Sequence, residues 1–249
     1  MPNPRSLLLI SNSTCHGQGY LDHCQQEIIC ALQTRDVLFI PYARPDGTSL
    51  RSYTLKAREK FEKMGMKLTG INEYGPSPED SIKAIQEAKT VFVGGGNTFN
   101  LLRTLRIQGL TRVMREKVMA GELTYIGASA GSNVAGLGIH TTNDMPVVDV
   151  SSFDGLGLVP FNINPHYIEK AEGSTHQGES RDTRIWEYLA LNGKPAKVIA
   201  LREGAMLRIF GDKMSLHGAE AFIFVPGDEI EKKKTKCTPG QSLDHLLAA

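Results

Sequence analysis

A serine between two glycines stands near the middle of the chain, in the stretch LTYIGASAG at 123–131. The pattern Gly-x-Ser-x-Gly around Ser129 is typical of a nucleophile elbow, in which a strand turns sharply into a helix and presents the serine at its tip. A tight turn built of small residues is the alternative. In the elbow interpretation Ser129 attacks an acyl group and the backbone N–H of Ala130 donates to the oxyanion, while Ser132 faces away from the tip.

A second glycine-rich turn follows another apolar run, in the stretch VFVGGGNTF at 91–99. It is not a P-loop, because no Gly-Lys-Ser/Thr follows, and Phe99 replaces the last glycine of a dinucleotide-binding motif. Glycine backbone can approach a ligand closely and point bare N–H groups at it, as an oxyanion hole requires. The alternative is a tight turn in which Asn97 or Thr98 caps the following helix.

A serine nucleophile needs a base that takes its proton. Among the seven histidines, His166 is the best candidate, because Pro165 before it restricts the local backbone. The imidazole in turn needs a carboxylate that fixes its tautomer and stabilises its cation. Asp144, in a polar turn beyond Ser129, and Glu203, at the end of an apolar run, both fit this role. The residues alone leave the choice open.

Short apolar runs and longer amphipathic stretches alternate along the chain and must position these side chains. Apolar runs occupy 6–11, 37–42, 66–71, 90–95, 123–128 and 197–202, and candidate helices lie near 19–33, 51–65, 80–88 and 98–119. This alternation predicts an α/β fold, a mostly parallel sheet with helices on both faces. Closely spaced runs within 206–226 predict a C-terminal antiparallel β extension. Ligands of open parallel sheets bind beyond the carboxyl ends of the strands, where both glycine turns lie.

The composition argues against several kinds of partner. Lysine and arginine number 28 and aspartate and glutamate 27, so the net charge of +1 favours neither a nucleic acid nor a membrane surface. The apolar run Leu7 to Ile10 is too short for a signal-peptide core or a membrane span, and few cysteines fit a reducing compartment. We therefore expect a cytoplasmic protein. No metal-ligand spacing is present, and we expect no metal and no cofactor.

The chain shows no linker and no internal repeat, so we expect residues 1–249 to form a single α/β domain. Its C-terminal part, from about residue 227, is polar and includes the cationic run EKKKTK at 231–236. We interpret this part as a solvated tail. The sequence does not set the oligomeric state, and a homodimer is compatible with it.

Six ordered stretches of the chain together resemble one family: LLLISNST, VFVGGGNTF, IGASAGSN, TTNDMPVVD, INPHY and ALREG. They resemble peptidase E, the aspartyl dipeptidase family of serine peptidases, whose flavodoxin-like fold is similar to that of class I glutamine amidotransferases. The resemblance runs from about residue 6 to about residue 226. It implies an enzyme that cleaves dipeptides with an N-terminal aspartate, written Asp-X.

The resemblance also assigns roles to residues. The nucleophile of the family falls on Ser129, its base on His166 and its third member on Glu203. The oxyanion N–H groups fall on Gly96 and Ala130.

Recognition of the substrate aspartate falls, by the same resemblance, on Arg181 in the segment GESR. Arg184 is the alternative, because the loop after the histidine is slightly longer than in bacterial relatives. Asp144 would then line the site near the substrate's α-ammonium group, and Asn97 would add a hydrogen bond. Two other functions stay open: a related acyl hydrolase acting on other aspartyl substrates, such as an aspartyl storage polymer, and a non-catalytic protein that binds acidic ligands.

Overall fold

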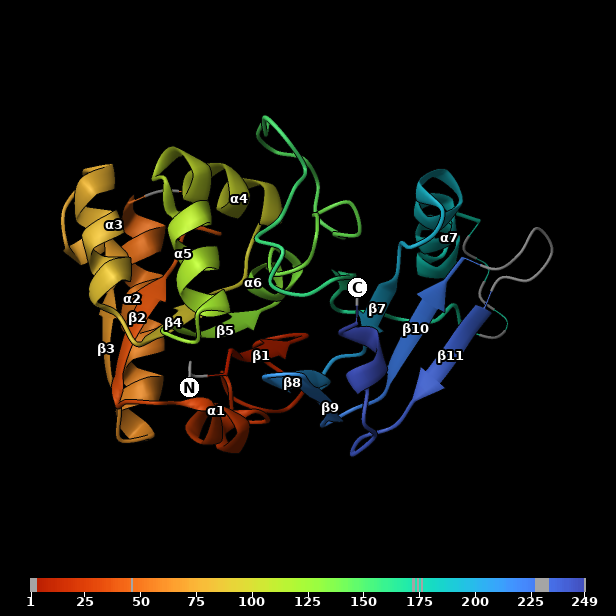
Figure 1. The fold of residues 1–249 in the computed structure, drawn as a ribbon, viewed down its shortest axis with the longest axis horizontal. Helices are drawn as coiled ribbons and strands as arrows, with labels where there is room; N and C mark the ends of the chain where they lie inside the picture. Colours follow the sequence, from red (N-terminus) through yellow and green to blue (C-terminus); the bar gives the residue numbers. More distant parts are fainter. Residues whose placement is uncertain are drawn as a thin grey trace.

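Two β-sheets carry the fold in the computed structural model, which describes residues 4–45, 47–171, 173, 175, 177–226 and 233–248 (Figure 1). The larger sheet has seven strands in the order β3-β2-β4-β5-β1-β8-β9, and the smaller has four in the order β11-β10-β7-β6. The strands of the larger sheet are β1 (Ser6–Ile10), β2 (Asp36–Ile40), β3 (Lys67–Gly70), β4 (Thr90–Val93), β5 (Thr124–Ala128), β8 (Met206–Phe210) and β9 (Lys213–His217). Those of the smaller sheet are β6 (Asn162–Asn164), β7 (Val198–Leu201), β10 (Ala221–Val225) and β11 (Lys233–Cys237).

The first five strands pair in parallel, and β8 and β9 extend the sheet in antiparallel fashion from β1. The helices are α1 (Gln25–Ala31), α2 (Gly47–Lys63), α3 (Pro78–Glu87), α4 (Thr98–Ile107), α5 (Leu110–Met119), α6 (Ala130–Asn133) and α7 (Arg181–Asn192), with 3-10 turns η1 (Ile71–Glu73) and η2 (Asp244–Leu246). The predicted α/β class and antiparallel extension are confirmed. Within the described residues, no helix has the length and apolar character needed to cross a bilayer.

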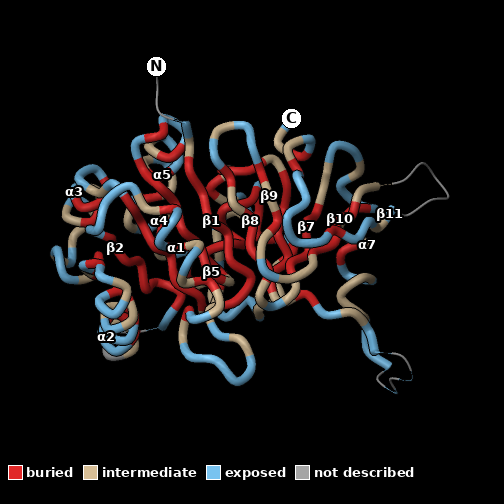
Figure 2. The backbone as a smooth tube through the Cα atoms, turned by 90° about the horizontal axis from the view of Figure 1, so that it is seen from below, coloured by how far each residue is buried: buried red, intermediate tan, exposed pale blue. Residues whose placement is uncertain are grey.

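Helices cover both faces of the larger sheet because the side chains of its strands alternate between them. In β1, Leu7 and Leu9 pack in the core formed with α3, α4 and α5, and Leu8 and Ile10 pack in the core formed with α1 and α2. All four side chains are fully buried. Figure 2 shows the central strands as the buried part of the molecule. A strand buried on both faces reads as a continuous apolar run, which is why it is visible in the sequence.

Local signals set the helix boundaries. The predicted helix 98–119 is two helices, α4 and α5, because Gly109 between them has the left-handed φ of 66°. The predicted helix 19–33 is shortened to α1, since Leu21 also has a positive φ, of 59°, and the chain turns there. Ser77 and Asp80 form a capping box at the start of α3.

The run 197–202 does not belong to the parallel sheet in which it was predicted. It forms β7 of the smaller sheet, parallel to β6 and antiparallel to β10. The edge of β1 that it could have joined is occupied by β8. One hydrophobic core nevertheless continues from Leu207 of the larger sheet to Ile199 and Ile223 of the smaller one. This continuity supports our proposal that the chain is a single domain.

The polar C-terminal part differs from its interpretation as a solvated tail. Residues 227–232, where that tail was predicted to begin, lie outside the described residues. Lys233–Cys237 form strand β11, which pairs in antiparallel fashion with β10. A run of lysines is compatible with an edge strand, because charged side chains keep an exposed edge from pairing with other chains.

Candidate active site

Ser129 occupies the sharp turn between β5 and α6, as predicted from its glycine pattern. Its φ of 55° and ψ of −110° lie in a region that residues with a side chain rarely adopt. A Cβ at Gly131 would lie 2.2 Å from the carbonyl oxygen of Val93, so only glycine fits beside the turn. Ser132 is fully buried, and its hydroxyl donates to the carbonyl oxygens of Ile10 and Gly127. Ser132 therefore stabilises the turn by linking the ends of β1 and β5.

Three side chains form a hydrogen-bonded chain at this turn. Ser129 Oγ lies 2.9 Å from Nε2 of His166, and Nδ1 of His166 lies 2.9 Å from Oε1 of Glu203. With the proton on Nδ1 donated to Glu203, Nε2 is free to accept the serine proton. The side chains of His166 and Glu203 are 40% and 55% exposed, so the base faces a solvent-accessible space. Of the two carboxylates left open by the sequence, Glu203 is the one that contacts the imidazole.

Polar residues directly after β1 bind backbone groups of His166 and of the segment around Glu203. Ser11 Oγ accepts a hydrogen bond of 2.9 Å from the N–H of His166 and donates one of 2.9 Å to the carbonyl of Leu201. Asn12 Oδ1 accepts from the N–H of Gly204, at 2.7 Å. Neither side chain is among the residues predicted from the sequence. Their signal was their place, since polar residues at the carboxyl end of a central parallel strand point toward a ligand site.

His166 has a left-handed backbone, with φ of 52°. A conformation of this kind costs a residue with a side chain about 1–3 kcal/mol and persists only where neighbours enforce it. Asn143 contributes here, because its Nδ2 donates to the carbonyl of Pro165 at 2.7 Å and its Oδ1 accepts from Asn164 at 2.8 Å. The prediction that the chain around Pro165 fixes the direction of the imidazole agrees with this geometry.

The glycine loop after β4 lies directly against the serine turn. A Cβ at Gly95 would stand 3.0 Å from Cβ of Ser129. The N–H of Gly95 is already bound to the hydroxyl of Tyr53, at 3.0 Å. Among the described residues no acceptor is found for the N–H of Gly96 or of Ala130. Two backbone donors next to the nucleophile are what an oxyanion hole requires.

Gly96 can take this position only as glycine. Its φ is 145°, and a Cβ there would lie 2.5 Å from the carbonyl oxygen of Ala43. That carbonyl accepts a hydrogen bond of 2.9 Å from the N–H of Asn97, so it cannot easily move away. The close approach of the two loops therefore fixes the direction of the Gly96 N–H.

Asp144 and Asn97 both lie at the N-terminus of α4. Asp144 Oδ2 accepts hydrogen bonds from the N–H of Thr98, at 2.7 Å, and from its hydroxyl, at 2.6 Å. Asn97 caps the helix by accepting from the N–H of Asn100 at 3.0 Å, and its amide donates to the carbonyl of Met145 at 2.8 Å. These contacts tie the glycine loop to the segment after it. The predicted contacts of the two residues with substrate stay predictions.

Arg181 is the first residue of α7, directly after the N-cap Ser180. Burial and the neighbouring Arg184 lower the pKa of the Arg181 guanidinium, and the charge of Asp144 acts in the opposite direction. The charges of Arg181 and Asp144 therefore interact. Arg184, the alternative, is exposed and forms an ion pair with Glu179 at 3.5 Å. Both arginines line one pocket, and the assignment of substrate recognition to Arg181 stays a prediction.

Two adjoining pockets open beside these residues. One has a volume of about 500 Å³ and the other of about 380 Å³, within the range of small-molecule sites. The first is lined by His166, Tyr167, Ile168, Glu169, Arg202 and Glu203. The second includes Arg181 and Arg184 and shares Ile168 and Glu169 with the first. In the part of the chain that the structure describes, no group of three or more His, Cys, Asp or Glu side chains could hold a metal ion.

Comparison with known families establishes the relationship of this chain. The sequence model of peptidase family S51 matches residues 7–217. The chain belongs to peptidase family S51. It is 44% identical over 221 residues to a Drosophila melanogaster protein named "Probable alpha-aspartyl dipeptidase", with 88% of each chain covered. It is 45% identical over 214 residues to peptidase E of Streptomyces coelicolor, with 86% of this chain and 84% of the relative covered. The predicted family resemblance is confirmed.

Solved structures show the same fold as this S51 member. A protein from Listeria monocytogenes EGD-e, assigned as a peptidase E, superposes with a TM-score of 0.65 at 22% identity, covering 86% of this chain and 98% of its own. A peptidase from an acI-B1 Actinobacterium gives 0.69 at 18% identity, with 98% of both chains covered. The S51 match ends at His217, so strands β10 and β11 lie beyond the matched residues.

Proposed function

We propose that this S51 member is a serine dipeptidase that hydrolyses dipeptides with an N-terminal aspartate. The observation that carries the proposal is the hydrogen-bonded chain from Ser129 Oγ through His166 to Glu203, which couples a nucleophile to a base and to the carboxylate that orients it. The name of the Drosophila relative supports the substrate class, and that of the Streptomyces relative supports a peptidase.

The reaction proceeds through an acyl-enzyme. Ser129 Oγ attacks the carbonyl carbon of the N-terminal aspartyl residue while His166 Nε2 takes its proton. His166 then gives that proton to the leaving amine as the peptide bond breaks. A water molecule attacks the ester, loses a proton to His166, and releases aspartate as Ser129 regains its hydrogen. The N–H groups of Gly96 and Ala130 stabilise the oxyanion in both halves, and Glu203 stabilises the imidazolium.

Specificity for aspartate comes from charge pairing. The guanidinium of Arg181 can bind the substrate's side-chain carboxylate with two parallel hydrogen bonds. In this proposal Asp144, whose charge acts on Arg181, attracts the substrate's α-ammonium group. A substrate with asparagine would leave the partly buried Arg181 without a charged partner, which a site of this kind penalises strongly.

The experiment is a panel of Asp-Leu, Asn-Leu, Glu-Leu and β-Asp-Leu with the wild type, Ser129→Ala, Arg181→Ala and Arg184→Ala. We expect Ser129→Ala to abolish Asp-Leu hydrolysis with an unchanged circular dichroism spectrum. Arg181→Ala should reduce cleavage of Asp-Leu far more than cleavage of Asn-Leu, and the matched Arg184→Ala should reduce neither. Turnover retained by Ser129→Ala would refute the nucleophile.

The same experiment separates the other functions. Faster cleavage of β-Asp-Leu or of an aspartyl polymer than of Asp-Leu would indicate an acyl hydrolase for other aspartyl substrates. A non-catalytic acidic-ligand-binding protein would not react with a serine-directed phosphonylating probe. We expect labelling in the wild type and none in Ser129→Ala.

We also infer a cytoplasmic location. All four cysteines are free thiols in the structure, although Cys24 and Cys237 are buried. Free thiols fit a reducing compartment, where disulfides are rare.

A further inference from the structure

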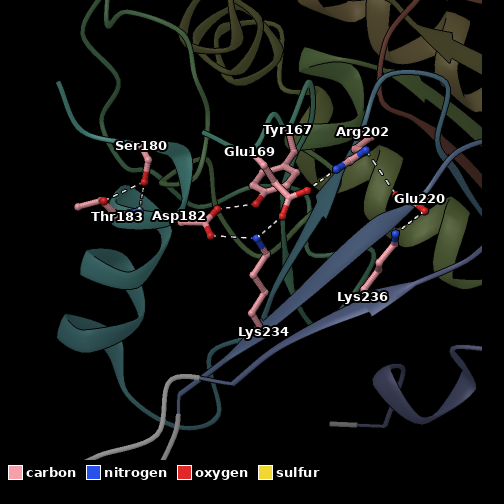
Figure 3. Close-up of polar contacts among 9 residues, drawn as sticks. All are labelled: Tyr167, Glu169, Ser180, Asp182, Thr183, Arg202, Glu220, Lys234 and Lys236. Carbon is pink, nitrogen blue, oxygen red and sulfur yellow. Dashed lines mark hydrogen bonds and ion pairs between the residues drawn. The ribbon is translucent and has the colours of Figure 1, made fainter. Parts of the chain in front are cut away.

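A network of charged side chains lies beside the proposed active site, between α7 and the edge strand β11 (Figure 3). Its centre is Lys234 of β11. The Nζ atom donates to Glu169 Oε1 at 2.8 Å and to Asp182 Oδ2 at 2.9 Å. The other oxygen of Asp182 accepts from the hydroxyl of Tyr167 at 2.5 Å, and the other oxygen of Glu169 accepts from Arg202. One ammonium group thus joins three separate segments of the chain.

Three members of this network stand next to the proposed functional residues in the sequence. Tyr167 follows His166, Asp182 follows Arg181, and Arg202 precedes Glu203. A displacement of any of these three residues moves the backbone from which the base, the specificity arginine or the carboxylate projects. The network therefore links the parts of the site that must be placed relative to one another.

Lys234 is built into this position by the strand register. It stands opposite Phe224 of β10, and its ammonium lies 4.5 Å from the ring centre of Phe222 and 5.4 Å from that of Tyr167. Only 24% of its side chain is exposed. Burial acts to lower the pKa of Lys234, but hydrogen bonds, led by the one to Glu169, outweigh it, so the pKa is raised and the ammonium stays charged.

Loss of this cation would leave two carboxylates facing each other. Glu169 would keep Arg202 as a partner, but Asp182 would keep only the hydroxyl of Tyr167 within the described network. Like charges repel, and a half-buried carboxylate without its cation draws in water. The start of α7, which carries Arg181, would then move away from the segment that carries His166.

We propose that Lys234 is a positioning residue of the active site, which sets the place of Arg181 relative to His166 and Glu203. The inference rests on the proposed function. It gives a role to a strand that lies beyond the residues matched by the family's sequence model.

The chain supplies a matched control on the same strand. Lys236 stands opposite Phe222, on the same face of β11, and its ammonium pairs with Glu220 at 2.6 Å. Its contact with Glu220 is one step further from the site, because Glu220 reaches Arg202 only at 3.4 Å. Removing the charge of Lys236 therefore shows how far the loss of a lysine on β11 by itself changes kcat/KM, because the contact between Lys234 and Asp182 stays in place.

The experiment compares Lys234→Met, Lys234→Arg and Lys236→Met in the full chain. The kcat and KM for Asp-Leu and Asn-Leu are measured per active site, counted with a phosphonylating probe, so that a smaller folded fraction does not affect the result. Displacements of about 1 Å can cost about 100-fold in rate. We expect Lys234→Met to lower kcat/KM for Asp-Leu at least about 10-fold and to reduce the preference for Asp-Leu over Asn-Leu, since Arg181 is displaced. Lys234→Arg should recover most of both, and Lys236→Met should resemble the wild type.

Asp182→Asn keeps the inference testable if Lys234→Met does not fold. Asp182→Asn should also lower the preference for Asp-Leu over Asn-Leu. In the double variant with Lys234→Met, if folded, the fold-loss of kcat/KM should be smaller than the product of the two single losses, because both changes act through one contact. The inference would be overturned if Lys234→Met kept the selectivity and the kcat/KM per active site of the wild type. If only Asp182→Asn folds, the same result in that variant would overturn it. A wild type that labels with the probe but does not cleave Asp-Leu would overturn the proposed function itself, which is a different result.

Discussion

Replacing Glu203 by glutamine decides which carboxylate supports His166. Glu203 Oε1 lies 2.9 Å from Nδ1 of the imidazole, whereas Asp144 binds the N-terminus of α4 through Thr98. The amide of glutamine is close in size to the carboxylate, and its oxygen can still accept a hydrogen bond from the Nδ1–H. The change therefore removes the charge with little change of shape.

The size of the effect follows from the exposure of the pair. Two unit charges about 4 Å apart interact by about 1 kcal/mol in water and by about 4 kcal/mol at an effective dielectric constant of about 20. The side chains are 40% and 55% exposed, which places the pair between these limits. The imidazolium exists only after proton transfer, so a loss of about 1–3 kcal/mol falls on the transition state and lowers kcat about 5- to 150-fold.

Asp144→Asn is the matched comparison. It should remove a charge from the N-terminus of α4 and lower the free energy of unfolding by about 0.5–2 kcal/mol. It should also raise KM, through the proposed attraction of the substrate ammonium, with a small effect on kcat. For both variants, kcat and KM are measured over a range of Asp-Leu concentrations, and stability is measured by urea unfolding. A larger loss of kcat in Asp144→Asn than in Glu203→Gln would refute the assignment.

Two further changes test the oxyanion loop and the pH dependence of stability. Gly96→Ala places a Cβ 2.5 Å from the Ala43 carbonyl, so the loop must shift, and kcat for Asp-Leu should fall about 100-fold. The control is Gly65→Ala, at a position with left-handed backbone and open space around it. This change should lower the free energy of unfolding by about 1–2 kcal/mol, measured with urea, and leave kcat unchanged. Equal losses of kcat in the two variants would refute the oxyanion role. Burial lowers the pKa of His23 in the folded protein, so the unfolded chain takes up a proton first as pH falls below about 6.5, and the free energy of unfolding decreases. His23→Asn should flatten that decrease between about pH 8 and about pH 5.5 in urea unfolding, and an unchanged slope would contradict it.

The parallel sheet was predictable because its strands are buried on both faces. A run such as Leu7 to Ile10, buried on both faces, is typical of a central strand. The smaller sheet was less visible. Strand β6 has three residues, two of them asparagines, and the partner of β7 is set by strands that come later in the chain. Pairing between distant segments depends on which edges are free, and periodicity does not record this.

The site was predictable where one short stretch carries its own geometry, as at Ser129. The choice between Asp144 and Glu203 was not, because it depends on which of two distant segments reaches the imidazole. The roles of Ser11 and Lys234 were hidden for a different reason. A serine after a strand and a lysine in a cationic run are common on protein surfaces, and only the contacts made in the folded chain distinguish these two.

The precision of the site has its origin in the carboxyl end of β1. Ser129 and His166 both have positive φ, and each such conformation costs about 1–3 kcal/mol. The N–H of Ser129 donates to the carbonyl of Ile10 at 3.0 Å, and the N–H of His166 donates to the hydroxyl of Ser11 at 2.9 Å. Because Ile10 and Ser11 are adjacent and fully buried, the two strained backbones are held by one rigid point. The distance from Ser129 Oγ to His166 Nε2 is therefore set by two adjacent residues at the end of a central strand, although Ser129 and His166 both lie in turns.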